Sequence, residues 1–360
     1  MKKSLSFLLL LFTFQVPAFA QLDKVEQAFT KAAEEGFSGV VVLSEGGEVV
    51  FEKAAGYREF ESGTPLLISD IFEMASITKQ FTAMMVMMCQ EKGLLDYGDL
   101  ADQYLDIPYK GVSIRQLLSH TNGLPDYQAV MDQHWDKSKV AGNEDILEYL
   151  RKFHPPMLAQ PGEKYEYSNT GYVFLASIVE KVTGRDFIEL SREWIFEPLG
   201  LSNTDIRTLE EKAMVKNFAA GHSLDEKGIY INANKFHSSD YTVWLGNRKG
   251  PGRISSNVHD LLNWDSALKA NRIVSGMTLD QAFSPTLLND GSLSYYGFGW
   301  DVDKYPQLGK TVSHTGSNPG YRNLIVRALD KDITFIMLNN NEHPSREALE
   351  RSIIEAMANW

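Results

Sequence analysis

The most distinctive hydrophobic stretch of the chain runs from residue 71 to residue 89, where 13 of the 19 positions are apolar. A helix that is apolar all round is buried in the protein, so this stretch predicts a central helix. Residues 23–35 and the last residues of the chain also have helical patterns, and the middle of the chain is mainly helical. Short apolar runs between turn residues predict strands over residues 39–43, 48–52, 296–302, 311–314, 323–327 and 333–338.

The distribution of these elements predicts an α/β (α+β) fold with two lobes. A single hydrophobic core seldom serves much more than about 300 residues, and the chain has 360. Because the strands lie near both chain ends, we expect an antiparallel sheet flanked by the N- and C-terminal helices. Residues 21–66 and 250–360 would form this sheet lobe, and residues 67–249 a mainly helical lobe inserted between them.

The first twenty residues have the three parts of a secretory signal. Lys2 and Lys3 precede an apolar run over residues 5–14, and Ala18-Phe19-Ala20 resembles a cleavage site. The run is shorter than the roughly 20 residues that a spanning helix needs, and no cysteine follows it for lipid attachment. The sequence therefore predicts a periplasmic or secreted protein without a membrane span, beginning at Gln21.

Charge and composition exclude several classes of function. The net charge is −12, and loss of residues 1–20, which hold two lysines and no acid, would make it −14. This lacks the basic surface that nucleic-acid binding requires. The single Cys89 cannot form an internal disulfide, and the eight histidines show no metal-ligand spacing. We therefore predict no metal and no cofactor, and a small molecule or peptide as the substrate. The sequence does not indicate an oligomeric state.

Candidate chemistry begins with Ser76-Ile77-Thr78-Lys79, at the start of the predicted central helix. Residues three apart lie on one helix face, so the Ser76 hydroxyl and the Lys79 amine can meet. Burial lowers the pKa of a lysine and can make the amine a proton acceptor. Alternatively, Ser76 caps the helix and Lys79 reaches the solvent. The same spacing recurs at Ser266 and Lys269, but in an amphipathic pattern where the lysine is expected to be solvated.

Two further motifs lie downstream. Tyr167-Ser168-Asn169 stands at a predicted loop-to-helix junction, and an ammonium beside Tyr167 would lower the pKa of its phenol. His314-Thr315-Gly316 ends a predicted strand, where a glycine can mark close approach by a ligand. Taken alone, a tyrosine such as Tyr167 is more often a packing residue, and His314 is equally compatible with a structural residue at a strand end.

The three motifs, in this order and approximate spacing, resemble those of the serine β-lactamase and penicillin-binding protein superfamily. The chain is most similar to its class C branch, which includes class C β-lactamases, DD-peptidases, D-aminopeptidases and β-lactamase-like esterases. Residues 117–125 and 250–256 also resemble this branch. The resemblance extends from about residue 23 to the end, and it implies an active site in the cleft between the lobes.

The resemblance implies a catalytic role for each of several residues. Ser76 would attack a carbonyl and form an acyl-enzyme, which splits one difficult step into two. Lys79 and Tyr167 would move its proton, as one unit. The backbone N–H groups of Ser76 and Ser317 would form the oxyanion hole.

The resemblance also implies the substrate-binding residues, with one departure from the β-lactamase pattern. Asn169 would bind the acyl-side amide or orient Lys79, Tyr127 would face the substrate, and Thr315 and Gly316 would border it. His314 stands where β-lactamases usually carry a lysine that attracts the carboxylate of a bicyclic lactam, and histidine is mostly neutral at pH 7. We expect a serine hydrolase that acts on an ester, a D-amino-acid peptide or a β-lactam. The alternative is a penicillin-binding-type protein that is acylated with little turnover.

Overall fold

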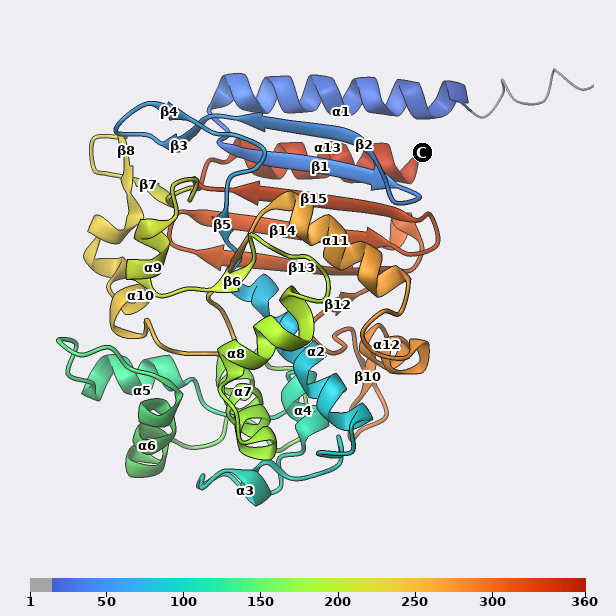
Figure 1. Cartoon of the computed structure of the whole chain (residues 1–360). Helices are drawn as coiled ribbons and strands as arrows, with labels where there is room; N and C mark the ends of the chain where they lie inside the picture. Colours follow the sequence, from blue (N-terminus) through green and yellow to red (C-terminus); the bar gives the residue numbers. More distant parts are fainter. Residues whose placement is uncertain (1–14) are drawn as a thin grey trace, which may run out of the picture.

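The structure, a computed structural model, describes residues 15–360 and is built around a six-stranded antiparallel sheet. The strand order is β12 (Asp301–Val302), β13 (Thr311–Asn318), β14 (Tyr321–Ala328), β15 (Ile333–Asn339), β1 (Gly39–Glu45) and β2 (Glu48–Ala55). Figure 1 shows the blue N-terminal strands directly beside the red C-terminal ones. The predicted sheet made from both chain ends is confirmed.

Alternate residues of the central strands serve two different cores, as the two-residue period of a strand requires. Val41 of β1 and Met337 of β15 face α1 (Gln15–Glu35) and α13 (Ser345–Ala358), which cover one side of the sheet. Val40 and Ile336 belong to the larger core on the other side, which α11 (Val258–Lys269) shares with the helical region. The sheet is thus covered on both sides.

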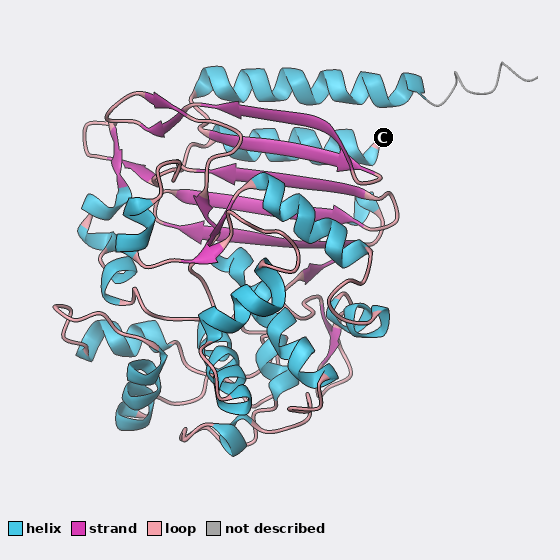
Figure 2. Cartoon of the chain, in the orientation of Figure 1, coloured by secondary structure: helices cyan, strands magenta, loops and turns pink. Residues whose placement is uncertain are grey.

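The helical region lies beyond the β12 edge of the sheet, in the lower half of Figure 2. Its centre is α2 (Thr78–Glu91), which follows the short 3-10 helix η1 (Ala75–Ile77) and packs against α7 (Asn169–Thr183). Further helices are α3 (Ala101–Tyr104), α4 (Ile114–Leu118), α5 (Tyr127–His134), α6 (Asn143–Phe153), α8 (Phe187–Ser191), α9 (Leu209–Met214), α10 (Tyr241–Trp244) and α12 (Gly276–Ala282). Small sheets pair β3 (Tyr57–Glu59) with β4 (Thr64–Pro65), β7 (His222–Leu224) with β8 (Tyr230–Asn232), β10 (Thr286–Leu287) with β11 (Leu293–Ser294), and β5 (Phe72–Glu73) and β6 (Asp205–Ile206) with β9 (Ile254–Ser256).

Two predicted strands differ from the observed ones. The strand expected over residues 296–302 is confined to Asp301–Val302, because the preceding residues pack as a loop against the central helix. Gly299 has a φ of +81°, and a Cβ there would lie only 2.8 Å from the Lys79 carbonyl oxygen. Conversely, β13 continues past His314 to Asn318, so the third motif lies within a strand.

The predicted signal sequence is only partly within the described residues. Residues 1–14 lie outside them, and residues 15–20 form the beginning of α1, which starts earlier than the helix predicted from residue 23. In residues 15–360, every helix is too short or too polar to cross a membrane.

Candidate active site

Ser76 lies in a constrained turn between β5 and α2. Ala75 has a φ of +49°, a left-handed conformation that residues with a side chain seldom adopt. Strand β13 passes directly against this turn, since a Cβ on Gly316 would lie 2.2 Å from the Met74 carbonyl oxygen. At Gly316 the close approach is therefore by the chain's own backbone, where we expected a ligand. This contact fixes β13 beside Ser76, whose side chain is only partly buried.

Lys79 is fully buried one turn after Ser76 and forms no ion pair with a carboxylate of the described residues. Its Nζ lies 3.1 Å from Ser76 Oγ and donates to the Pro251 carbonyl oxygen at 2.9 Å. Burial holds the pKa of Lys79 well below its ordinary value, and the nearby positive charge of Arg248 lowers it further. A neutral amine is therefore available to accept the Ser76 proton.

Tyr167 lies on the other side of the amine, at the end of the loop before α7. Lys79 Nζ is 4.8 Å from its ring centroid, and its hydroxyl interacts with the Ser76 side chain. Although 41% of the residue surface is exposed, the phenol oxygen is surrounded by protein. Burial raises the pKa of Tyr167, and the contact with Ser76 opposes this only partly. The expected lowering of the Tyr167 pKa is wrong, because burial disfavours the charged phenolate.

His314 is buried in β13 and is neutral at pH 7. Its Nδ1 donates to the Thr315 carbonyl oxygen at 2.6 Å, which leaves Nε2 to accept from the Tyr296 hydroxyl at 3.0 Å. Burial lowers the pKa of His314 to about 4. His314 therefore offers no positive charge to a substrate carboxylate, as its residue type indicated.

The other expected substrate-binding residues surround a small pocket of about 90 Å³ next to the nucleophile. Ser76, Tyr127, Asn169 and Ser317 all line it. Asn169 is placed there because Ser168 caps α7 by accepting from Gly171 N at 3.1 Å, so the helix starts at the pocket wall. Thr315 and Gly316 do not line the pocket, but they precede Ser317 on β13.

Several residues near the site were not predicted from the sequence, and His120 is the clearest of them. It is fully buried with a φ of +56°, and its ring lies 4.2 Å from the Tyr167 ring. Its Nδ1 accepts from Ser168 N at 3.0 Å, so Nε2 carries the hydrogen, and Nε2 has no partner within residues 15–360. The position of His120 in the 117–125 segment was the available signal.

Arg248, Tyr241 and Asn318 were missed for a different reason. They line the same pocket as Ser76, but they come from a loop, the start of the short helix α10 and a strand end, without a recognisable spacing. Arg248 lies just before the segment 250–256. No local pattern distinguishes them from surface residues.

The second Ser-x-x-Lys match is not part of the site. Ser266 is exposed on α11, as expected. Lys269 is not simply solvated, because it pairs with Asp265 at 3.0 Å and with Asp332 at 2.6 Å. These carboxylates stabilise its charged form.

Comparison with known proteins supports the same interpretation of the site as its geometry does. A family model described as Beta-lactamase matches residues 22–358. The chain belongs to this family. Penicillin-binding protein 4* of Bacillus subtilis (strain 168) is 37% identical over 324 residues, which are 89% of this chain and 71% of that protein. A D-aminopeptidase of Brucella anthropi is 25% identical over 326 residues, 87% of this chain but only 58% of that protein. The resemblance seen in the sequence is confirmed, and this Beta-lactamase family member is a serine hydrolase.

Solved structures of the family share the fold. A penicillin-binding protein homologue from Pyrococcus abyssi, described as octameric, has a TM-score of 0.79 and 26% identity over 94% of this chain and 76% of its own. A D-amino acid amidase from Ochrobactrum anthropi SV3 has a TM-score of 0.78 and 22% identity over 94% of this chain and 98% of its own. At that identity, the amidase supports the fold alone.

Proposed function

We propose that this protein hydrolyses small esters and D-amino-acid amides or peptides through an acyl-enzyme on Ser76. The observation that carries the proposal is the buried Lys79 amine, 3.1 Å from Ser76 Oγ and without a carboxylate partner among the described residues. A positioned general base contributes about 10²–10⁴-fold to the rate of such a reaction.

The order of steps follows from the two shifted pKa values. Lys79 accepts the Ser76 proton while Oγ attacks the substrate carbonyl, and the resulting oxyanion is stabilised by the N–H groups of Ser76 and Ser317. When the intermediate collapses, the leaving amine or alcohol takes a proton from Lys79, directly or through the Tyr167 hydroxyl. Water then attacks the acyl-enzyme and loses a proton to Lys79 or Tyr167. These groups pass that proton to Ser76 Oγ as the acid product is released. Lys79 is the acylating base because Tyr167 is protonated in the resting enzyme.

The substrate class rests on His314 and on the names of the relatives. A neutral, buried His314 gives no electrostatic attraction for the carboxylate of a bicyclic lactam, so β-lactam hydrolysis should be slow. D-aminopeptidases occur among the curated relatives. We therefore rank esters and D-amino-acid amides above β-lactams.

The chain provides its own matched control for a test of this function. Purified enzyme should cleave 4-nitrophenyl acetate and D-alanine p-nitroanilide, with nitrocefin the poorest substrate of the panel. Ser76→Ala should lower kcat by at least about 10³-fold, whereas Ser266→Ala, in the second Ser-x-x-Lys sequence, should leave it unchanged. Equal activity of the two variants would exclude Ser76 as the nucleophile.

A second candidate is a penicillin-binding-type protein that is acylated and released slowly. The relative with 37% identity carries the name of a penicillin-binding protein, which favours this reading. Intact-mass spectrometry after incubation with benzylpenicillin distinguishes the two. A stable adduct on Ser76 without ester turnover would support the second candidate, and turnover without a lasting adduct supports the first.

We also propose that the protein is exported and that residues 1–20 are removed. The support is the order of the two lysines, the apolar run and Ala18-Phe19-Ala20. N-terminal sequencing of the protein from a periplasmic or culture fraction should begin at Gln21. Recovery of the uncleaved chain in the cytoplasm would contradict the proposal.

A further inference from the structure

Arg248 is a buried cation with an incompletely paired guanidinium, which lies 5.9 Å from the Tyr241 ring centroid. The residue is only 8% exposed, and within residues 15–360 its Nε and Nη1 atoms have no hydrogen-bond partner. Burying a charged group is costly unless it is paired, and buried polar groups in native proteins are nearly always satisfied. An arginine in this state indicates that a bound molecule supplies the missing acceptor.

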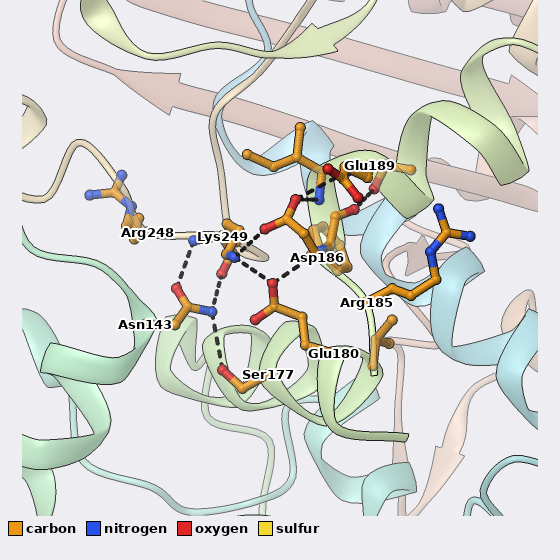
Figure 3. Close-up of polar contacts among 12 residues, drawn as sticks. Asn143, Ser177, Glu180, Arg185, Asp186, Glu189, Arg248 and Lys249 are labelled. Atoms are coloured by element: carbon orange, nitrogen blue, oxygen red, sulfur yellow. Dashed lines mark hydrogen bonds and ion pairs between the residues drawn. The ribbon is translucent and has the colours of Figure 1, made fainter. Parts of the chain in front are cut away.

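The neighbouring cations are all satisfied, which sets Arg248 apart. Lys249 pairs with Glu180 and with Asp186, the latter at 3.0 Å. Figure 3 shows the Arg248 side chain pointing away from these two carboxylates. Arg253, also buried, donates to the backbone oxygens of Arg248 and Arg207 at 3.4 and 2.9 Å. The fold therefore has acceptors for the cations around Arg248 but none for Arg248 itself.

The backbone next to Arg248 is firmly held, so its side chain is positioned in advance. Asn143 accepts from Lys249 N at 2.7 Å and donates to the Lys249 carbonyl oxygen at 3.2 Å (Figure 3). It also donates to Ser177 on α7 at 3.2 Å. Preorganisation of this kind lowers the entropy that binding must overcome.

The incompletely paired guanidinium lies next to the nucleophile. Arg248 lines the 90 Å³ pocket together with Ser76, Asn169 and Ser317, and no acidic residue is among the described residues that line it. A Cβ built on Gly252 would lie 3.7 Å from Arg248 Nη2 and 3.9 Å from the carbonyl oxygen of Ala75, which precedes Ser76. The charge is thus within reach of a group attached to the reacting carbonyl.

A larger cavity on the other side of Arg248 extends this positive region. The cavity measures about 320 Å³ and is also lined by Arg207, Lys212 and Arg253. Among its described lining residues, Glu73 is the only acid, and it is paired with Lys212. In a chain with a net charge of −12, this local excess of positive charge is directed at the active site.

We propose that Arg248 binds a carboxylate on the acyl portion of the substrate, and that this enzyme prefers acyl groups that carry a negative charge. An arginine fork matches a carboxylate with two parallel hydrogen bonds. The inference rests on the proposed serine hydrolase function and specifies its substrate. Free D-amino-acid amides, which carry an α-ammonium group at this position, should therefore be cleaved less efficiently than their N-succinyl derivatives.

The position of Arg248 assigns the charge to the acyl side and not to the leaving group. Arg248 shares its pocket with Asn169 and with Ser317 and Asn318, at the far end of β13 from His314. In a bicyclic lactam the carboxylate belongs to the ring that carries the leaving nitrogen. His314, in the middle of β13, stands where β-lactamases usually carry the lysine that attracts this carboxylate. Arg248 therefore defines a separate subsite.

Three substrates of equal core and different charge test the proposal. N-succinyl-D-alanine p-nitroanilide is anionic, the N-butyryl analogue has nearly the same shape without charge, and D-alanine p-nitroanilide is cationic. We expect kcat/KM for the succinyl substrate to exceed that for the butyryl substrate by about tenfold or more, with the cationic substrate poorest. In Arg248→Gln the ratio should fall close to one, and in Arg248→Lys it should be intermediate.

Matched controls separate this subsite from other effects. Arg272→Gln removes an exposed arginine outside the site and should retain the wild-type ratio. If Arg248 acted only on the pKa of Lys79, Arg248→Gln would change all three substrates by one factor and leave the ratio intact, which would overturn the proposal. A wild-type ratio near one would do the same.

A binding measurement keeps the proposal testable without turnover. Calorimetry on Ser76→Ala should show tighter binding of N-succinyl-D-alaninamide than of N-butyryl-D-alaninamide, and the added Arg248→Gln substitution should remove the difference. Equal binding of the two amides would overturn the Arg248 assignment. Failure of the proposed function is recognised separately, as cleavage that does not depend on Ser76 or as no cleavage at all.

Discussion

The two Ser-x-x-Lys sequences of this chain have the same spacing and opposite surroundings. Lys79 is fully buried, with Ser76 Oγ and the Pro251 carbonyl oxygen as its nearest polar partners. Lys269 is partly exposed and lies between the carboxylates of Asp265 and Asp332. The comparison shows that spacing alone does not define a catalytic lysine. What matters is whether the fold stabilises the charged or the neutral amine.

Burial and the positive charge of Arg248 favour the neutral form of Lys79. The rings of Tyr167 and Tyr172 lie 4.8 and 5.5 Å from its Nζ, and both tyrosines are protonated because burial raises the pKa of each phenol. The one strong charge nearby is the positive Arg248, which opposes a second positive charge. Around Lys269, two negative charges have the opposite effect.

The largest expected effect comes from making the Lys79 charge permanent. Lys79→Arg keeps a long cationic side chain but cannot accept a proton, so kcat for 4-nitrophenyl acetate should fall by about 10³-fold. Lys269→Arg, the same change in the second motif, should alter kcat by less than about twofold. Comparable losses in both variants would mean that Lys79 acts through its charge or its packing, and not as a base.

The sequence predicted those parts of the site that are local. Ser76 and Lys79 are three residues apart, and Asn169 begins a helix with a visible cap, so their placement follows from short-range patterns. The sequence also indicated that another group approaches Gly316 closely. The structure shows that this group is the Met74 backbone and not a ligand.

The sequence could not predict what depends on long-range packing. The direction of the Tyr167 pKa depends on burial by segments far away in the chain. Arg248 and His120 reach the site from loops. Only the folded structure shows that nitrogen atoms of these two side chains lack hydrogen-bond partners among the described residues. Long-range packing also explains why the strand predicted over residues 296–302 is shorter in the structure. Gly299 packs against α2 with a positive φ that a strand does not have.

The pH dependence provides the next test of the comparison. A base acts only when unprotonated, so kcat/KM should decrease as pH falls through the pKa of Lys79. Because burial lowers that pKa, the decrease should occur at a lower pH than the ordinary pKa of a lysine would give. Arg248→Gln removes a charge that lowers the pKa of Lys79, so the acidic limb should move to higher pH. His314, with a pKa of about 4, should not contribute above pH 5.

The pH profile should be measured with a neutral substrate such as 4-nitrophenyl acetate, because binding of a charged substrate to Arg248 would itself change kcat/KM. If kcat/KM instead increases tenfold per pH unit up to pH 9, Lys79 has a nearly ordinary pKa. The buried amine would then be a poor base at neutral pH, and the difference between the two lysines would lose its chemical meaning.

The smallest expected effects concern stability. Replacing Lys79 and replacing Lys269 should change the free energy of unfolding in opposite directions. Keeping a lysine neutral at pH 7 costs roughly 4–5 kcal/mol relative to the solvated ammonium, and Lys79→Met removes this cost. The lost hydrogen bonds, including that to the Pro251 carbonyl oxygen, offset about 1–3 kcal/mol. The free energy of unfolding at pH 7 should therefore rise by about 2 kcal/mol in this inactive variant. Between the folded and unfolded pKa values of Lys79 the unfolded chain binds more protons, so wild-type stability increases with pH and the gap should narrow at pH 9.

Lys269→Met should instead lower the free energy of unfolding at pH 7, by about 0.5–1 kcal/mol, because it removes two partly exposed ion pairs. Urea denaturation of the wild type and both variants at pH 7 and pH 9 measures the change in the free energy of unfolding for each variant at each pH. Destabilisation by Lys79→Met at both pH values would indicate that the buried amine is held by more favourable contacts than Ser76 and Pro251 provide.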